Sequence, residues 1–287
     1  MDQKIIDLYD DYVHRHFDRR LFLDRLAKYT GSMAAAVAVL PLLQSNYALA
    51  ATVAENDARI RTRRVTIPGA TGPLSAYLAQ PTGGGRHGGV LVVHQNRGLN
   101  PHIEDIARRL ATEGYVSVAV DFLSPLGGTP ADENAAMQMF SKLDPAQTTA
   151  NAVASVKYIR ALSDVNGKVG AVGFCWGGGV INQLAANDPS LNAGVVYYGT
   201  PPAPDQAAKV HAMMLLNYAD KDLDKRNGDL APGWADALKA QGKLSGFYFY
   251  AGAQHAFNDD TNAARYDKEA ADLAWSRTLA LFKANLT

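Results

Sequence analysis

A tight strand-to-helix turn near the middle of the chain constrains the fold most. The short apolar run 168–172 leads directly into Gly173-Phe174-Cys175-Trp176-Gly177-Gly178-Gly179, which opens a helical pattern. Such a turn holds its central residue in a strained backbone conformation, and the flanking positions must be glycine because neighbouring chains approach too closely for a Cβ. The pattern predicts a nucleophile elbow with Cys175 at its tip, where the N-terminus of the following helix favours the thiolate.

Strand and helix patterns alternate around this turn. Apart from the run before the turn, strands are predicted at 64–67, 74–78, 90–93, 115–120, 193–198, 212–218 and 246–250. Helices are predicted at 102–112, 132–142, 146–162, 176–187, 233–241 and 266–284. This alternation predicts one α/β domain over residues 60–287, with a mostly parallel central sheet and helices on both faces. The first two strands predict an antiparallel hairpin at one edge of the sheet.

The N-terminal segment, residues 1–51, differs from the rest of the chain in its residue pattern. Arg19-Arg20 precede an apolar run at 33–43, and Ala48-Leu49-Ala50 fits the small-x-small pattern of a signal-peptidase site. Together these features resemble a twin-arginine export signal, which would place the mature protein in the periplasm. The alternative is that residues 4–43 are retained helices packed on the domain of a cytoplasmic protein. The apolar run is too short to span a bilayer, so we expect no permanent membrane anchor.

Charge and cysteine content exclude several classes of function. Lysine plus arginine equals aspartate plus glutamate at 28 each, and no basic stripe interleaved with aromatic residues occurs, so no nucleic-acid partner is expected. The single cysteine cannot form an internal disulfide or a cysteine-rich zinc site. We therefore expect no metal, and the lone thiol becomes the first candidate for chemistry.

A nucleophile at an elbow needs a general base, and in this type of site the base follows an acid along the chain. Two histidines follow the elbow in the sequence. His211 begins an apolar run, which is typical of a structural residue at a strand end. His255 lies in the Gly252–Phe257 loop, between the last predicted strand and the last predicted helix. The order of the elements therefore favours His255 as the base.

The acid is expected in the loop after strand 212–218, which reads Asp220-Lys221-Asp222-Leu223-Asp224. Asp222 is the predicted acid, because the loop must turn for a few residues before it reaches back toward the histidine. Asp220 is the alternative. A thiol, an imidazole and a carboxylate in this order can attack a carbonyl carbon, such as that of a small-molecule ester or lactone.

These motifs resemble the dienelactone hydrolases over about residues 60–285. The resemblance implies an α/β-hydrolase fold and hydrolysis of an enol-lactone through an acyl-thioester, without a metal or organic cofactor. Carried over by position, Cys175 is the nucleophile, His255 the base and Asp222 the residue that orients it. The backbone N–H groups of Trp176 and Asn96 would form the oxyanion hole.

The chain departs from the family pattern at two places. Gln95 stands where the family has a glutamate beside the nucleophile, and the loop 121–128 lacks the arginine of members that take a carboxylated dienelactone. Arg97 is a candidate for binding a substrate carboxylate instead. Because Gln95 carries no charge, we expect a larger thiolate fraction than a glutamate would allow; the alternative is a structural hydrogen bond at the strand end. Phe257 is expected in an apolar acyl pocket or, alternatively, in the core.

Two other functions compete with hydrolysis. A binding protein that kept the fold but lost catalysis would explain Gln95. A redox sensor would use Cys175 as an oxidisable thiol, although no second cysteine is present to resolve the oxidised form. The oligomeric state does not follow from the sequence.

Overall fold

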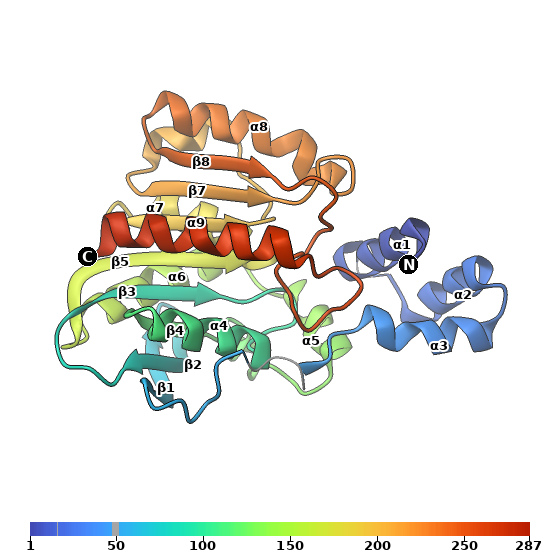
Figure 1. Cartoon of the computed structure of the whole chain (residues 1–287), viewed down its shortest axis with the longest axis horizontal. Coiled ribbons are helices and arrows are strands. Elements are labelled where there is room, and N and C mark those ends of the chain that lie inside the picture. Colours follow the sequence, from blue (N-terminus) through green and yellow to red (C-terminus); the bar gives the residue numbers. More distant parts are fainter. Residues whose placement is uncertain (16, 48–51) are drawn as a thin grey trace.

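The computed structural model describes residues 1–15, 17–47 and 52–287, and one mixed sheet organises this part of the chain (Figure 1). The sheet has the strand order β1-β2-β4-β3-β5-β6-β7-β8. Its strands are β1 (Ile60–Gly69), β2 (Gly72–Pro81), β3 (His87–Val93), β4 (Val116–Val120), β5 (Val165–Phe174), β6 (Ala193–Tyr197), β7 (Met213–Tyr218) and β8 (Leu244–Phe249). β1 pairs antiparallel with β2, and β2 with β4, whereas the remaining neighbours are parallel. The predicted edge hairpin and parallel core are confirmed.

Helices cover both faces of the sheet. They are α4 (Pro101–Thr112), α5 (Glu133–Phe140), α6 (Pro145–Arg160), α7 (Trp176–Asn187), α8 (Lys225–Ala240) and α9 (Lys268–Leu286), with short 3₁₀ turns at Ser124–Leu126 and Pro204–Lys209. α4 and α9 pack into one apolar core, and α6, α7 and α8 into the other. Because both faces of the central strands are buried, those strands are continuously apolar instead of alternating.

α8 begins earlier than the sequence predicted. The helix starts at Lys225, not near residue 233, and the side chain of Asp224 caps its N-terminus by accepting a hydrogen bond from the backbone N–H of Asn227. Pro232 lies inside this helix. A proline normally marks the first turn of a helix or breaks its interior, which is why the pattern pointed to a later start.

The N-terminal segment forms three helices, α1 (Gln3–Arg15), α2 (Arg19–Thr30) and α3 (Met33–Leu43). They lie beside the ends to which the parallel strands point (Figure 1). Their own small core includes Tyr12 and Phe22, whose rings stack with centroids 4.6 Å apart. This arrangement corresponds to the retained-helix alternative. The export signal stays a prediction, and its cleavage site at 48–50 lies outside the described residues.

Among the described helices, one bent pair has the combined length and hydropathy of a membrane span. No single helix among the described residues is long and apolar enough to cross a membrane. α2 and α3 pass the length and hydropathy criteria only together, and a bend of 107° separates them.

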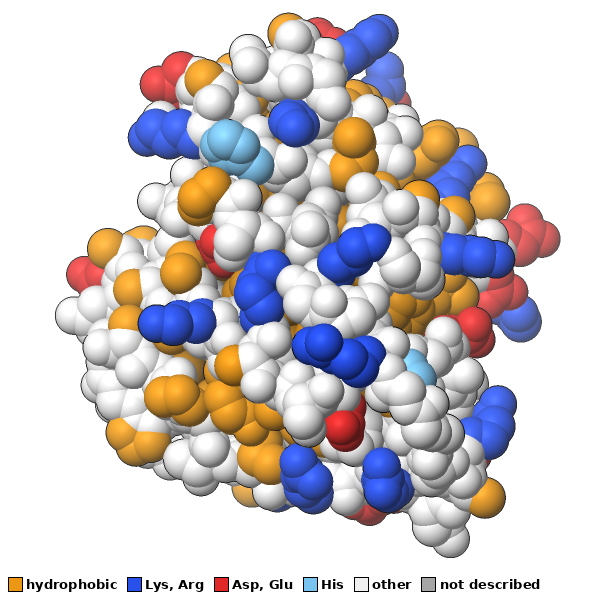
Figure 2. Space-filling model, turned by 90° about the vertical axis from the view of Figure 1, so that its left-hand side faces the viewer, with side chains coloured by type: hydrophobic (Ala, Val, Ile, Leu, Met, Phe, Trp, Pro, Cys, Tyr) orange, Lys and Arg blue, Asp and Glu red, His pale blue; other side chains and the backbone are white. Residues whose placement is uncertain are grey.

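Charged side chains are dispersed over the face shown in Figure 2. Lysine and arginine side chains are spread among neutral and apolar atoms, and acidic side chains occur around them. This face carries no continuous basic patch of the kind that follows a nucleic-acid backbone.

Candidate active site

The predicted elbow is present at the carboxyl end of β5. Cys175 stands between β5 and α7 with φ 53° and ψ −117°, in the region of positive φ that side chains other than glycine rarely adopt. A Cβ on Gly173 would lie 2.2 Å from the carbonyl oxygen of Gly177, and one on Gly177 would lie 2.4 Å from that of His94. The glycines therefore allow the close packing that holds the thiol in place.

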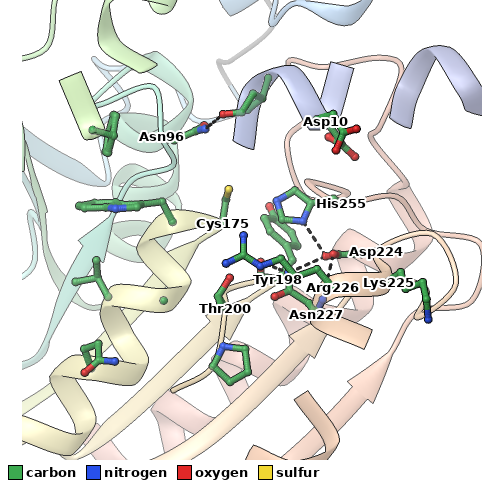
Figure 3. Close-up of a pocket in the computed structure, with 18 of the residues that line it drawn as sticks. Asp10, Asn96, Cys175, Tyr198, Thr200, Asp224, Lys225, Arg226, Asn227 and His255 are labelled. Carbon is green, nitrogen blue, oxygen red and sulfur yellow. Dashed lines mark hydrogen bonds and ion pairs between the residues drawn. The ribbon is translucent and has the colours of Figure 1, made fainter. Parts of the chain in front are cut away.

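His255 reaches the thiol from the loop after β8. Its Nδ1 donates a hydrogen bond of 2.8 Å to Oδ2 of Asp224, and its ring interacts with Cys175 on the other side (Figure 3). The side chains of His255 and Asp224 are only 7% and 11% exposed. Asp224 also accepts a 2.9 Å hydrogen bond from Nδ2 of Asn227. The thiol, the imidazole and the carboxylate thus form one connected line.

The electrostatics of this line favour an ion pair. Burial by itself disfavours the imidazolium, but attraction to Cys175 and Asp224 and hydrogen bonding to both raise the pKa of His255 well above its usual value. For Asp224, burial opposes ionisation, but the charge and hydrogen bonds of His255 and Asn227 hold its pKa at about 2. These interactions favour the protonated form of the imidazole, which lies between the ionised Asp224 and the thiol of Cys175.

The predicted acid, Asp222, is wrong: the carboxylate that binds His255 is Asp224. The reason is the early start of α8, which turns its N-cap residue toward the histidine. Asp222 is exposed at the rim of the pocket. The alternative, Asp220, binds the backbone N–H of Gly252 at 2.8 Å and so ties the acid loop to the histidine loop. Asp224 stands at the N-cap of α8, where aspartate is strongly preferred, and this was the sequence signal that could have identified the acid.

A cavity of about 830 Å³ opens over the thiol. Its apolar wall is formed by Phe140, Leu143, Pro145, Trp176, Val180 and Pro201. Trp176 stacks on the ring of His94 with centroids 5.5 Å apart and meets the ring of Phe140 at 74°. The cavity is therefore large enough for a small organic molecule, with one apolar side that suits an acyl or alkoxy group.

The two predicted oxyanion-hole residues both border the cavity. Trp176 is the first residue of α7, and Asn96 lies on the loop after β3. Nδ2 of Asn96 donates a 3.1 Å hydrogen bond to the backbone carbonyl of Val13 in α1 (Figure 3). The structure therefore brings both residues to the same pocket as Cys175.

Three other predicted site residues lie outside the cavity lining. Gln95 is buried, and its Nε2 lies 3.4 Å from Oδ2 of Asp259, which agrees with the structural alternative. Phe257 is fully buried among Tyr198 and Tyr250, so it belongs to the core. Neither side chain is placed to touch a substrate.

Arg97 is buried as well and is held by protein groups. Its Nη2 donates a 3.0 Å hydrogen bond to the hydroxyl of Tyr9, and its Nη1 donates one of 3.0 Å to Oγ of Ser45. Nε lies 3.4 Å from Glu133. The prediction that Arg97 binds a substrate carboxylate is therefore wrong for this structure, because the guanidinium binds residues far away in the sequence.

Sequence reasoning missed two contributions to the pocket. Tyr198 follows β6, has φ 42° and lines the cavity, with its ring 5.0 Å from that of His255. Its position at the carboxyl end of a parallel strand was the available signal. The other contribution is α1, whose residues Asp7, Asp10, Asp11 and Val13 form part of the wall. Nothing in the residue pattern of α1 indicated this contact.

A cluster of potential metal ligands lies outside the lining of this cavity. His102, Asp259 and Asp260 bring potential ligand atoms within 4.8 Å of one another. Arg109 forms an ion pair with Asp260, and Nδ1 of His102 binds the same carboxylate at 3.0 Å. These partners already neutralise the cluster, which therefore has the character of an internal ion-pair network.

Comparison with known proteins gives a consistent result. The model of the dienelactone hydrolase family matches residues 74–286, and a model described as YqhI-like matches residues 1–31. The "Putative carboxymethylenebutenolidase" of Methylorubrum extorquens is 31% identical over 248 residues, which cover 81% of this chain and 84% of that protein. The Escherichia coli protein "Putative hydrolase fragment YghX" is 42% identical over 113 residues, which cover 38% of this chain and 97% of that protein.

Solved structures agree with these relatives. The crystal structure of the "Putative Dienelactone Hydrolase" from Klebsiella pneumoniae superimposes with a TM-score of 0.69 at 30% identity, covering 78% of this chain and 98% of that one. The matched region contains the elbow, the acid loop and the histidine loop. The chain is thus a hydrolase of carboxylic esters or lactones, and it belongs to the dienelactone hydrolase family.

Proposed function

We propose that the chain cleaves its ester or lactone with a Cys175–His255–Asp224 triad through an acyl-thioester. The observation that carries this proposal is the connected line of the three side chains, with the thiol at a strained elbow and Asp224 2.8 Å from the imidazole. Asp224 fixes the tautomer and orientation of the ring, as the acid of a triad does. No metal or organic cofactor takes part in the proposed cycle.

The first half of the cycle acylates the thiol. The thiolate of Cys175 attacks the carbonyl carbon, a C–S bond forms, and the π electrons move to the carbonyl oxygen. The backbone N–H groups of Trp176 and Asn96 would stabilise this oxyanion; loss of one such donor costs about 3 kcal/mol. As the tetrahedral species collapses, the C–O bond breaks and His255 gives its proton to the departing alkoxide.

The second half releases the acid. His255, now neutral, takes a proton from water, and the resulting hydroxide attacks the thioester carbonyl. The second tetrahedral species collapses with cleavage of the C–S bond, and the thiolate and imidazolium are restored. The sum is one ester and one water converted to one acid and one alcohol, or to a hydroxy acid from a lactone.

The pocket supports a substrate with an apolar group next to the reacting carbonyl. Trp176, Phe140 and Val180 offer an apolar wall beside the thiol. A dienelactone carboxylate lacks the partner that Arg97 would have supplied, since that guanidinium is enclosed by Tyr9 and Ser45. The cationic side chains that do line the cavity are Lys225 and Arg226, so a carboxylated substrate would have to meet these residues instead of Arg97.

The test uses chromogenic short-chain esters and a panel of lactones. Wild-type protein should show turnover that Cys175→Ala and His255→Ala abolish, while both variants keep the circular dichroism spectrum of the wild type. Turnover that survives in Cys175→Ala would overturn the proposal. Absence of any turnover, with binding of the same compounds, would favour the non-catalytic alternative.

A further inference from the structure

α1 holds the loop that carries Asn96. The backbone carbonyl of Val13 accepts the 3.1 Å hydrogen bond from Nδ2 of Asn96, and the hydroxyl of Tyr9 accepts the 3.0 Å hydrogen bond from Arg97, one residue further along. Both side chains on the loop are more than nine-tenths buried. The loop is therefore fixed by a helix that lies outside the region matched to the hydrolase family.

The helix itself is anchored independently of this loop. Asp10 forms an ion pair with Arg265, whose guanidinium also lies 4.9 Å from the ring centre of Tyr9. The hydroxyl of Tyr12 donates a 2.8 Å hydrogen bond to Oδ1 of Asn134 in α5. Since α1 is held from several sides, it can act as a rigid support for the residues it binds.

Rigidity at this loop has a direct chemical consequence. An oxyanion donor stabilises the transition state only when it is held where the charge develops, and looseness of a few tenths of an ångström weakens it. We infer that α1 is a working part of the active site, in which Tyr9 and the Val13 carbonyl position the Asn96 N–H for the oxyanion. Tyr9 is thus a positioning residue that acts through Arg97. This inference rests on the proposed oxyanion hole and extends it to the N-terminal segment.

A matched pair of substitutions tests the inference. Tyr9→Phe and Tyr29→Phe each remove one hydroxyl from the N-terminal helices, but Tyr9 binds Arg97 next to Asn96, whereas Tyr29 is 54% exposed on α2. Tyr9→Phe should lower kcat about fivefold to tenfold with little change in KM, because the oxyanion forms only in the transition state. Tyr29→Phe should have a kcat within about twofold of the wild type.

A second variant addresses the Val13 contact directly. Asn96→Ala keeps the backbone N–H and removes the side-chain donor to the Val13 carbonyl without adding a charge beside the thiol. It should lower kcat more than Tyr9→Phe does. It should also weaken binding of a simple aliphatic aldehyde, which forms a tetrahedral hemithioacetal with the thiol. The rate of alkylation of Cys175 by iodoacetamide should stay near the wild-type value in both variants, since that displacement forms no oxyanion.

The outcomes separate this inference from the proposed function. A selective loss of kcat and of aldehyde binding in Tyr9→Phe and Asn96→Ala, with normal alkylation, supports it. Equal kcat in Tyr9→Phe and Tyr29→Phe, or parallel losses of kcat and alkylation, overturns it while the triad stands. If Cys175→Ala retains activity, the proposed function fails first.

Discussion

Oδ2 of Asp224 lies 2.8 Å from Nδ1 of His255, and the same carboxylate caps the N-terminus of α8. One side chain therefore fixes both the start of a helix and the orientation of the base. The helix N-terminus itself favours an anion at this position, in addition to the imidazolium.

Replacing Asp224 by asparagine should lower kcat by at least about 100-fold, because the amide can present its NH₂ group to the ring and stabilise the wrong tautomer. Asp222→Asn is the matched control, two residues earlier at the pocket rim, and should stay within about twofold of the wild type. Steady-state kinetics with one ester measure both. A near-normal Asp224→Asn with an inactive Asp222→Asn would restore the acid predicted from the sequence.

The depressed pKa of Asp224 makes part of the free energy of unfolding depend on pH. The carboxylate holds a pKa of about 2 in the folded chain, against about 3.9 in an unfolded one. Its contribution, about 2 kcal/mol, is present above pH 4 and is lost as the pH falls toward 2. Urea denaturation of the wild type and Asp224→Asn should differ at pH 6 and converge near pH 2. A constant difference over that range would contradict the ion pair.

The raised pKa of His255 predicts that the thiol of Cys175 reacts at pH values below the ordinary pKa of a thiol. The imidazolium stabilises the thiolate of Cys175, so alkylation by iodoacetamide should remain fast at pH 6. In His255→Ala the alkylation profile should move up toward the usual thiol value of about 8.5. Superimposable profiles would show that the ring does not share the proton of the thiol.

Gln95 has a different predicted role once its partner is known. A glutamate at this position would place a second buried carboxylate beside Asp259, and like charges in a buried site repel. Gln95→Glu should therefore destabilise the fold by about 2 kcal/mol at pH 7, and less at pH 5 where the pair can hold a proton. Thermal denaturation at both pH values measures this. A changed alkylation profile with normal stability would instead support the original expectation of a residue beside the thiol.

The elbow glycines give a stability prediction with an internal control. A Cβ on Gly177 would lie 2.4 Å from the His94 carbonyl oxygen, whereas the nearest atom to a Cβ on Gly179 is 3.5 Å away. Gly177→Ala should cost about 3 kcal/mol or more, while Gly179→Ala should be neutral or slightly stabilising in the helix. Equal melting temperatures for the two variants would contradict the packing described at the elbow.

The strand and helix order was predictable because buried parallel strands leave continuous apolar runs, and Cys175 and His255 were predictable because their loops carry local patterns. Asp224 was missed because Pro232 favoured a helix start near residue 233, so Asp224 was expected in the loop and not at the N-cap of α8. Arg97 was misassigned for another reason: Tyr9, Ser45 and Glu133 surround it from distant parts of the chain. No local pattern records such an environment, and the same holds for the contact of α1 with the pocket.

The place of α1 in the pocket also bears on the export prediction. If α1 positions Asn96, the active protein must retain residues 1–47. Intact mass of the protein purified from its native host should then correspond to the full chain. A mature protein that begins near residue 51 and is fully active would contradict both the retained segment and the role of Tyr9.

The central claim is that a covalent acyl group forms on Cys175, and rapid-quench mass spectrometry with a p-nitrophenyl ester tests it most directly. Within the first turnover the protein should gain the mass of one acyl group, and peptide mapping should place it on Cys175. The adduct should disappear as the ester is consumed, and Cys175→Ala should never show it. Steady turnover with no adduct on the thiol, or an adduct on another residue, would contradict the account.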